Sequence, residues 1–163
     1  MNDRRAFLGL AGTAAVSLLI FGCSGISATS MNFTVNRAPA QWKQLLGAQR
    51  YAILREAATE RPFSSPLLDE HRKGTFVCAG CALPLFSSAT KFESGTGWPS
   101  FWKPLPHAVV TRADNSLLME RTEVLCARCG GHLGHVFDDG PKPTGLRYCM
   151  NGLALNFRPG AVA

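Results

Sequence analysis

The order of apolar and polar positions divides the chain into an apolar leader, a polar spacer, a short helical region and a long series of short strands. The leader is an apolar run from Ala6 to Gly22, which follows a basic start and precedes small residues. This pattern is typical of an export signal that does not belong to the mature fold. Residues 24–38 are rich in Ser, Thr and Asn, as in a tether. We therefore expect an export signal and tether over residues 1–30 and a folded domain over residues 31–163.

Two details of the leader bear on localisation. The opening "RRAFLGL" fits a twin-arginine signal, and an ordinary secretory signal with two basic residues is the alternative. "IFGC" resembles the cleavage box of a bacterial lipoprotein ending at Cys23, although Phe21 is bulkier than usual there. Cleavage at the small residues 27–30 would instead remove Cys23. We expect an exported, periplasmic protein that touches the membrane only through its signal or a lipid on Cys23.

Helical spacing of apolar residues begins near Ala40. Trp42, Leu45 and Leu46 are spaced to share one helix face, and Gly47 can end the first helix. The apolar positions of residues 51–57 indicate a second short helix, which closes before the next proline. The sequence therefore predicts short helices at the start of the domain.

Beyond Pro66 the helical spacing gives way to short β-type runs separated by Gly, Pro, Asn and Asp. "ADNS" at 113–116 is suited to a hairpin turn between two of them. The runs are "GTFVC", "WPSFW", "AVVTR", "LLMERTEVLC", "HVF" and "LRYCMNGLALNF". The expected fold is mainly β, a small antiparallel domain preceded by short helices.

The formal net charge is +6, and the basic residues are spread along the chain rather than clustered. A nucleic-acid interface gathers Lys and Arg on one face or along one helix. We therefore interpret the charge as favouring solubility and expect no nucleic-acid partner.

Four cysteines form two C-x-x-C pairs, Cys78 with Cys81 and Cys126 with Cys129. Each such turn directs two sulfurs at one point, and two turns together complete a tetrahedron for zinc. Gly130 and Gly131 suit the tight backbone of a zinc knuckle. Two disulfides, or one thioredoxin-like redox pair, are the alternatives in an exported protein. We favour a closed structural zinc site with four cysteine ligands, which clamps the two halves of the domain.

Cys149 stands apart from both pairs, in "LRYCMN". If this run is a strand, Arg147, Cys149 and Asn151 share one side, while Leu146, Tyr148 and Met150 face the core. A guanidinium and an amide beside a thiol favour the thiolate, which is the reactive form. A buried structural cysteine is the plainer alternative.

Three more residues are candidates for chemistry near this thiol. His132 and His135 follow the second cysteine pair and could polarise Cys149 or deliver a proton. They could also be zinc ligands or packing residues, although the cysteine pairs already fill the metal site. Trp98 lies between Gly97 and Pro99, which makes it a candidate for the wall of a pocket rather than for the core.

The segments "CAGC", "KFESGTGWPSFW", "CARCGGHLGHVFDDGPKPTGLRYCMN" and "LALNF" occur in the order found in the methionine-R-sulfoxide reductase B family, and the chain resembles this family from about Trp42 to Phe157. The resemblance implies a protein-repair enzyme that reduces methionine-R-sulfoxide in proteins or peptides. It further implies structural zinc, a thioredoxin-like thiol donor as partner, and a monomer.

The resemblance also implies a role for each candidate residue. Cys149 matches the nucleophile, which attacks the sulfoxide sulfur and is left as a sulfenic acid. The polar residues that bind and protonate the sulfoxide oxygen are matched by His132, His135 and Asn151. Trp98 matches the indole that packs on the substrate methyl group, and Arg147 the basic residue two positions before the nucleophile. The zinc ligands are matched by Cys78, Cys81, Cys126 and Cys129.

Two positions depart from the family pattern. Thr96 replaces the cysteine that many members use to form a disulfide with the nucleophile. We therefore expect an external thiol to reduce the sulfenic acid on Cys149 directly. Gly152 replaces a common serine after the asparagine.

Two interpretations from other classes compete with the enzyme. One is a zinc-ribbon-like binding module in which Cys149 is merely buried, and the other is a lipoprotein held together by disulfides. Loss of activity in Cys149→Ser separates the enzyme from the first, and zinc content separates it from the second.

Overall fold

The computed structural model describes residues 31–116 and 120–160, so the predicted signal and the lipid site at Cys23 lie outside the described residues. Of the predicted tether, residues 31–38 are described, and the prediction is wrong for Val35, whose backbone N–H donates to the carbonyl of Arg128 at 3.0 Å and whose side chain packs against the core. The helices are α1 (Pro39–Glu56) and the short 3₁₀ helices η1 (Ser88–Thr90) and η3 (Gly152–Ala154). The strands are β1 (Gly74–Cys78), β2 (Pro84–Ser87), β3 (Lys91–Phe92), β4 (Ser100–Phe101), β5 (Val109–Asp114), β6 (Arg121–Cys126), β7 (His132–Phe137), β8 (Arg147–Met150) and β9 (Leu155–Pro159).

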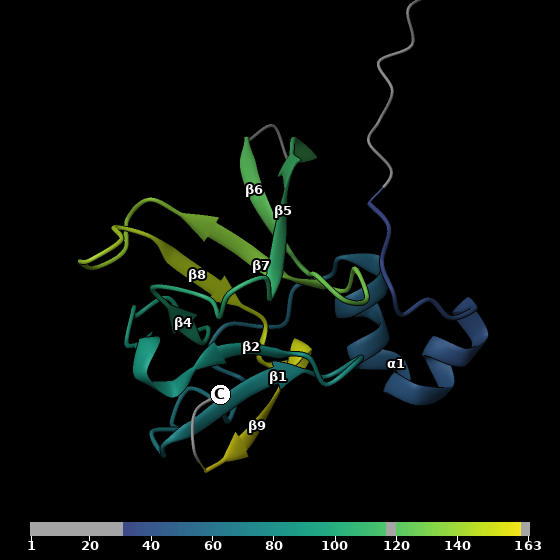
Figure 1. Cartoon of the computed structure of the whole chain (residues 1–163), viewed down its shortest axis with the longest axis horizontal. Coiled ribbons are helices and arrows are strands. Elements are labelled where there is room, and N and C mark those ends of the chain that lie inside the picture. Colours follow the sequence, from purple (N-terminus) through teal and green to yellow (C-terminus); the bar gives the residue numbers. More distant parts are fainter. Residues whose placement is uncertain (1–30, 117–119, 161–163) are drawn as a thin grey trace, which may run out of the picture. The chain divides into compact units, whose positions relative to one another are not determined.

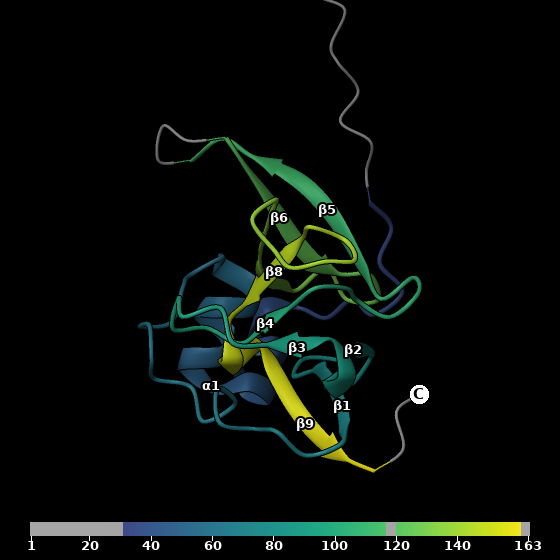
Figure 2. The same cartoon turned by 90° about the vertical axis from the view of Figure 1, so that its left-hand side faces the viewer.

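The strands of the described residues form two antiparallel sheets, which confirms the predicted fold class (Figure 1). The smaller sheet has the order β2-β1-β9, and the larger one the order β3-β4-β8-β7-β6-β5. Figure 2 shows β1 and β9 on one side of the domain and the β5–β6 hairpin on the other, with β4 and β8 between them. The strand that carries Cys149 thus lies in the middle of the fold.

Three aromatic side chains fill the space between the sheets. Phe76 on β1 meets Phe101 on β4 edge to face, with ring centroids 4.9 Å apart. Phe86 on β2 stacks on the same ring at 4.4 Å. All three side chains are fully buried, so this contact excludes water from the junction of the sheets and fixes β4 beside β8.

The predicted break in the helical region is present at Gly47, whose φ of 68° lies in the left-handed region that favours glycine. Trp42 and Leu46 are buried as predicted. The prediction that Leu45 shares their face is wrong, because this side chain is 55% exposed. Adjacent residues on a helix point about 100° apart, and here the core covers Leu46 but not Leu45.

Other predictions from the strand pattern need correction. "LRYCMNGLALNF" is not one strand, because η3 interrupts it and sends β8 and β9 into different sheets. In "WPSFW" only residues 100–101 pair as a strand. The "ADNS" turn is longer than predicted: Asp114 accepts a hydrogen bond from the backbone N–H of Ser116 at 3.0 Å, but β6 resumes only at Arg121.

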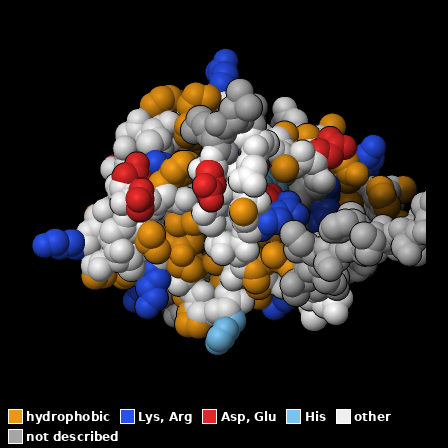
Figure 3. Space-filling model, turned by 90° about the horizontal axis from the view of Figure 1, so that it is seen from above, with side chains coloured by type: hydrophobic (Ala, Val, Ile, Leu, Met, Phe, Trp, Pro, Cys, Tyr) orange, Lys and Arg blue, Asp and Glu red, His pale blue; other side chains and the backbone are white. Residues whose placement is uncertain are grey.

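Charged side chains are dispersed over the surface. On the face shown in Figure 3, the described basic side chains are separated by acidic, apolar and neutral ones. None of the helices within residues 31–116 and 120–160 has both the length and the apolar composition needed to cross a membrane.

Candidate active site and metal centre

The two cysteine pairs meet at one point, although they come from different sheets. Cys78 ends β1 and Cys126 ends β6, and each is followed by a turn that carries the second cysteine of its pair. The Sγ atoms of Cys78 and Cys129 are 3.7 Å apart, and those of Cys81 and Cys126 are 3.5 Å apart. All four sulfur atoms lie within 4.8 Å of one another. The predicted clamp between the two halves of the domain is therefore present in the geometry.

The sulfur–sulfur distances distinguish metal binding from the two alternatives for the cysteines. A disulfide joins sulfurs at about 2.05 Å, and all four cysteines are free. A tetrahedral zinc ion with bonds of about 2.3 Å separates its sulfur ligands by roughly 3.8 Å. The backbone N–H of Gly80 points at Cys78 Sγ from 3.4 Å, as expected in a knuckle that holds thiolates. The cluster fits a metal ion bound by four cysteines.

The helix braces this cluster. The indole of Trp42 lies beneath the guanidinium of Arg55, whose Cζ is 5.0 Å from the ring centroid. Arg55 also donates a hydrogen bond to the carbonyl of Cys129 at 2.9 Å. Helix α1 therefore contacts the backbone of the second cysteine turn.

Cys149 lies on β8 between β4 and β7, opposite Ser100 on one side and His135 on the other. Its thiol is half-buried and faces the hydroxyl of Thr96, with 3.7 Å between Oγ1 and Sγ. Tyr148 packs on Phe86, and Met150 is fully buried, as predicted for the core side of this strand. Leu146, predicted on the same side, lies before β8 and is half-buried.

A cavity of about 100 Å³ lies beside this thiol. It brings together four of the predicted residues, namely Trp98, His135, Cys149 and Asn151. Thr59, Arg121, Gly134 and Phe137 complete its lining. The indole forms an apolar wall, whereas the imidazole and the amide supply polar groups, so the cavity presents both kinds of surface to a bound group.

The two histidines are held by carboxylates from neighbouring strands. His135 Nε2 lies 2.8 Å from Oδ2 of Asp114, and His132 Nδ1 lies 2.7 Å from Oε1 of the buried Glu123. The rings meet edge to face at 5.4 Å. Because a carboxylate only accepts, each bonded ring nitrogen is the donor. His132 does not line the cavity, but its Nε2 is buried and has no hydrogen-bond partner among the described residues.

The carboxylates are in turn tied to arginines. Arg112 pairs with Glu123 at 2.6 Å, and Arg121 pairs with Asp114 at 2.7 Å. Burial raises the pKa of Glu123, but hydrogen bonds from His132 and Arg112 outweigh this and leave the pKa below its ordinary value. Burial lowers the pKa of His135 by more than the Asp114 carboxylate raises it, which favours a neutral imidazole.

The setting of Cys149 differs from the prediction in one respect. Burial raises the pKa of this thiol above its ordinary value, and the opposing effects of Thr96, Arg147 and Ser100 do not cancel the rise. The guanidinium of Arg147 is shared with Asp139, to which it donates two hydrogen bonds of 2.8 Å. The guanidinium therefore acts on the pKa in the predicted direction, but burial, which the sequence did not show, has the larger effect.

Glu60, which the sequence did not single out, ties three parts of the site together. Its backbone N–H donates to Asn151 Oδ1 at 3.0 Å, and its carbonyl accepts from the Trp98 indole at 3.1 Å. Its buried carboxylate accepts hydrogen bonds from the backbone N–H groups of Gly152 and Leu153. One residue thus orients both the amide and the indole of the cavity.

Steric crowding explains why residue 152 is a glycine in this chain. A Cβ built there would lie 1.9 Å from Oγ of Ser65, so no side chain fits. Ser65 is buried, and its hydroxyl accepts a hydrogen bond from the backbone N–H of Leu67 at 3.2 Å. Ser65 therefore occupies the space that a side chain at position 152 would need.

Local sequence patterns missed Glu60, Asp114 and Glu123, because each reaches the site from another segment. One signal was present for Glu123: it sits in "TEVLC", where the following residues are apolar and buried. An acidic residue in such a strand needs a buried partner, which predicts an ion pair or hydrogen bond. Neither Asp114 nor Glu60 stands out in this way.

Comparisons with known proteins find relatives over most of the chain. The model of the SelR domain matches residues 46–159. A peptide methionine sulfoxide reductase MsrB of Leptospira interrogans is 54% identical over 129 residues, which covers 78% of this chain and 98% of the relative. A protein of the same name from Bradyrhizobium diazoefficiens is 56% identical, and the match covers 77% of this chain and 91% of the relative. One from Methanosarcina barkeri is 52% identical, and the match covers 76% of this chain and 88% of the relative. The chain therefore belongs to the MsrB family of peptide methionine sulfoxide reductases.

Proposed function

We propose that the protein reduces methionine-R-sulfoxide in proteins or peptides to methionine, with Cys149 as the nucleophile. The observation that carries this proposal is the small cavity in which the thiol, an indole wall, an imidazole and an amide meet. Its volume of about 100 Å³ holds roughly three water-sized groups, which suits the methyl, sulfur and oxygen of one side-chain end. If the methyl group of the substrate packs on the indole while its oxygen binds the polar donors, only one epimer at the sulfur fits.

The reaction balances with the groups at hand. The sulfur of Cys149 attacks the sulfoxide sulfur while the oxygen takes up a proton, which makes it a better leaving group. The protonated oxygen then passes from the substrate sulfur to the sulfur of Cys149, and the bond between the two sulfurs breaks. Methionine departs as a thioether, and Cys149 is left as a sulfenic acid. In this proposal the free ring nitrogen of His135 or His132 takes up the proton of the Cys149 thiol, whose pKa is raised by burial, and passes it to the sulfoxide oxygen. Asn151 orients the oxygen.

Regeneration requires a reductant from outside the chain. Thr96 occupies the position next to Cys149, so the nearest side chain there is a hydroxyl. A first external thiol would condense with the sulfenic acid and release water, leaving a mixed disulfide. A second thiol would then attack this mixed disulfide, which releases Cys149 as a thiol and joins the two donor sulfurs in a disulfide. A thioredoxin-like dithiol supplies both equivalents.

The metal that we propose for the four-cysteine cluster is zinc in a structural role. A site with four protein ligands leaves no open position for a substrate, and zinc adds no redox chemistry of its own. Zinc would hold the ends of β1 and β6 together and thereby fix the scaffold that positions β7 and β8. None of the catalytic steps above uses the metal.

We further propose that the protein acts after export, in the periplasm. The support is the leader pattern of residues 1–30, with its adjacent arginines and apolar run. Oxidation turns the apolar methionine side chain into a polar one, so a repair enzyme is useful where oxidants arrive first.

One assay tests the proposed function. The full chain is given a peptide with either the R or the S epimer of methionine sulfoxide, with dithiothreitol as reductant, and product is followed by mass spectrometry. We expect turnover of the R epimer only, and loss of at least about a thousandfold in Cys149→Ser. A sulfenic-acid trap such as dimedone should label Cys149 after one turnover without thiol. Equal turnover by Cys149→Ser, or of both epimers, would overturn the proposal.

A further inference from the structure

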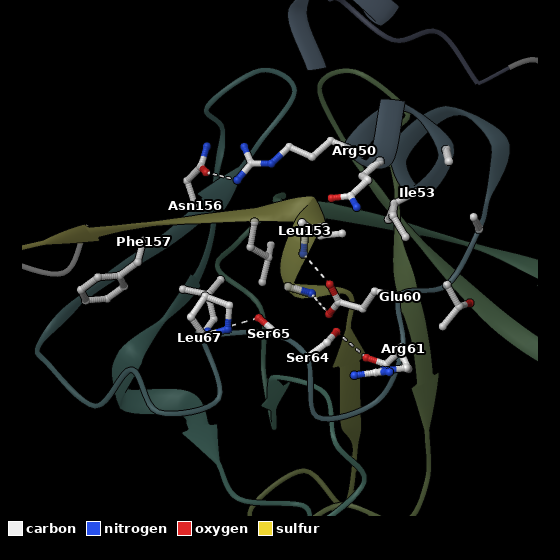
Figure 4. Close-up of a pocket in the computed structure, with 17 residues that line it drawn as sticks. Arg50, Ile53, Glu60, Arg61, Ser64, Ser65, Leu67, Leu153, Asn156 and Phe157 are labelled. Carbon is white, nitrogen blue, oxygen red and sulfur yellow. Dashed lines mark hydrogen bonds between the residues drawn. The ribbon is translucent and has the colours of Figure 1, made fainter. Parts of the chain in front are cut away.

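A second and larger cavity adjoins the one beside Cys149. Its volume is about 620 Å³, and Thr59 lines both cavities. Helix α1, the loop after it and the segment from η3 into β9 form its walls (Figure 4). The backbone of Glu60 holds Trp98 and Asn151 of the small cavity, while its side chain lines the large one. The two spaces are therefore neighbours built on the same short segment.

The charged groups of the large cavity leave a net positive lining. The carboxylate of Glu60 is already used by two backbone N–H groups (Figure 4). Arg50 donates to Asn156 at 2.9 Å, and Arg61 is exposed. Neither arginine is paired with an acidic side chain among the described residues. An anionic group entering the cavity would thus meet two guanidinium groups and no free carboxylate.

The rest of the lining suits a segment of polypeptide. Ile53, Leu153 and Phe157 offer apolar surface, and the exposed amides of Gln49 and Asn156 can bond to peptide groups. The small cavity admits little more than the end of one side chain, so the residues next to an oxidised methionine must lie outside it. The large cavity is the adjoining space that can take them.

We propose that this large cavity binds the residues flanking methionine sulfoxide in a polypeptide substrate and that Arg61 and Arg50 favour an acidic residue there. The inference rests on the proposed function and adds a sequence preference to it. An exposed ion pair changes an equilibrium about twofold to fivefold. We expect a preference of that size for Asp over Asn near the sulfoxide, and a larger one for Asp over Lys.

The test uses three peptides that differ only in having Asp, Asn or Lys within two residues of one methionine-R-sulfoxide. The value of kcat/KM is measured for each with the wild type, Arg61→Gln and Arg61→Glu at low and high salt. We expect the Asp preference to shrink in Arg61→Gln, to reverse in Arg61→Glu and to weaken with salt. Arg158→Gln, which removes an exposed arginine outside the cavity, should keep the wild-type ratio.

The peptides themselves separate the two proposals. Failure of the wild type to reduce any of the three peptides would count against the proposed function, whereas the ratios among them test only the binding of flanking residues. Equal kcat/KM ratios in the wild type and both Arg61 variants would overturn the binding proposal. A changed KM for the reducing thiol, with unchanged peptide ratios, would assign the cavity to the reductant and overturn it as well.

Discussion

The domain holds sulfur in two settings that differ in what surrounds the atom. In the four-cysteine cluster each sulfur has other sulfurs as neighbours, at 3.5 Å and 3.7 Å across the pairs. Cys149 instead faces a hydroxyl at 3.7 Å, with an imidazole on the adjacent strand and a cavity beside it. Burial is similar in kind, since both settings include half-buried thiols. The difference teaches that the partners and the open space, rather than exposure alone, decide whether a cysteine holds a structure or reacts.

The largest effect expected from this comparison comes from making one substitution in both settings. Cys126→Ser removes a ligand, and a four-cysteine zinc site contributes folding energy on the order of 10 kcal/mol in small domains. That loss is comparable with the whole stability of a domain, about 5–15 kcal/mol. We expect Cys126→Ser to lose its zinc and its cooperative thermal unfolding, measured by elemental analysis and circular dichroism.

Cys149→Ser is the matched control for this prediction, because it makes the same chemical change in the other setting. It should keep one zinc ion per chain and the melting temperature of the wild type. If Cys126→Ser also kept both, the cluster would not be the metal clamp described here.

The second prediction concerns Glu123, a buried carboxylate that supports the surroundings of Cys149 and has no counterpart in the four-cysteine cluster. Glu123→Gln keeps the size of the side chain but removes the charge that fixes His132, so proton delivery should weaken. General acid catalysis contributes about a hundredfold or more, and we expect a loss of at least about tenfold in kcat. KM and the melting temperature should change little, and the pH profile of kcat should shift, which a purely structural role would not cause.

Glu93→Gln serves as the control for the carboxylate at 123. Glu93 also pairs with a basic residue, Lys91, at 3.1 Å, but its side chain is 64% exposed. An effect of Glu93→Gln on kcat as large as that of Glu123→Gln would show that the loss does not come from the imidazole contact.

How far the sequence predicts the molecule depends on whether the relevant contact is local. The C-x-x-C spacing brings two sulfurs together within each pair, Cys78 with Cys81 and Cys126 with Cys129. Strand alternation places Tyr148 and Met150 in the core. Leu45 shows the limit for helices, since its spacing from Trp42 fits the helical period and its side chain is nevertheless 55% exposed. Local pattern therefore predicts elements better than it predicts which side chains they bury.

The residues that support the site lie far from it along the sequence, and this is why local sequence patterns did not reveal them. Glu60 reaches Gly152 across more than half of the chain, and Asp114 reaches His135 from β5, two strands beyond β7. Such contacts depend on how the sheets are ordered, which no short motif encodes. The raised pKa of Cys149 has the same origin, because burial by distant segments outweighs the polar neighbours in its own strand.

The third prediction makes the surroundings of Cys149 resemble those of the cysteine pairs. In Thr96→Cys a second sulfur would stand where Oγ1 now lies, 3.7 Å from Cys149 Sγ, and rotation of the side chains can close that gap. We expect one turnover without external thiol to yield an intramolecular disulfide, seen by mass spectrometry, in place of a trappable sulfenic acid. Thr111→Cys on β5, three strands and about 14 Å from β8, should still give the sulfenic acid.

The smallest effect is expected from the hydroxyl at Thr96, which opposes the rise that burial causes in the pKa of Cys149. Thr96→Val removes this hydrogen bond at nearly constant volume, so the thiol form gains further. One neutral hydrogen bond is worth about 0.5–1.5 kcal/mol, and a sulfur contact at 3.7 Å belongs at the lower end. The midpoint of the pH profile for alkylation of Cys149 by iodoacetamide should therefore move to higher pH. At pH values below this midpoint, the alkylation rate should fall about twofold to fivefold. Thr96→Ser keeps the hydroxyl and should retain the wild-type profile, whereas a Thr96→Val profile that moved to lower pH would mean that the hydroxyl favours the thiol and not the thiolate.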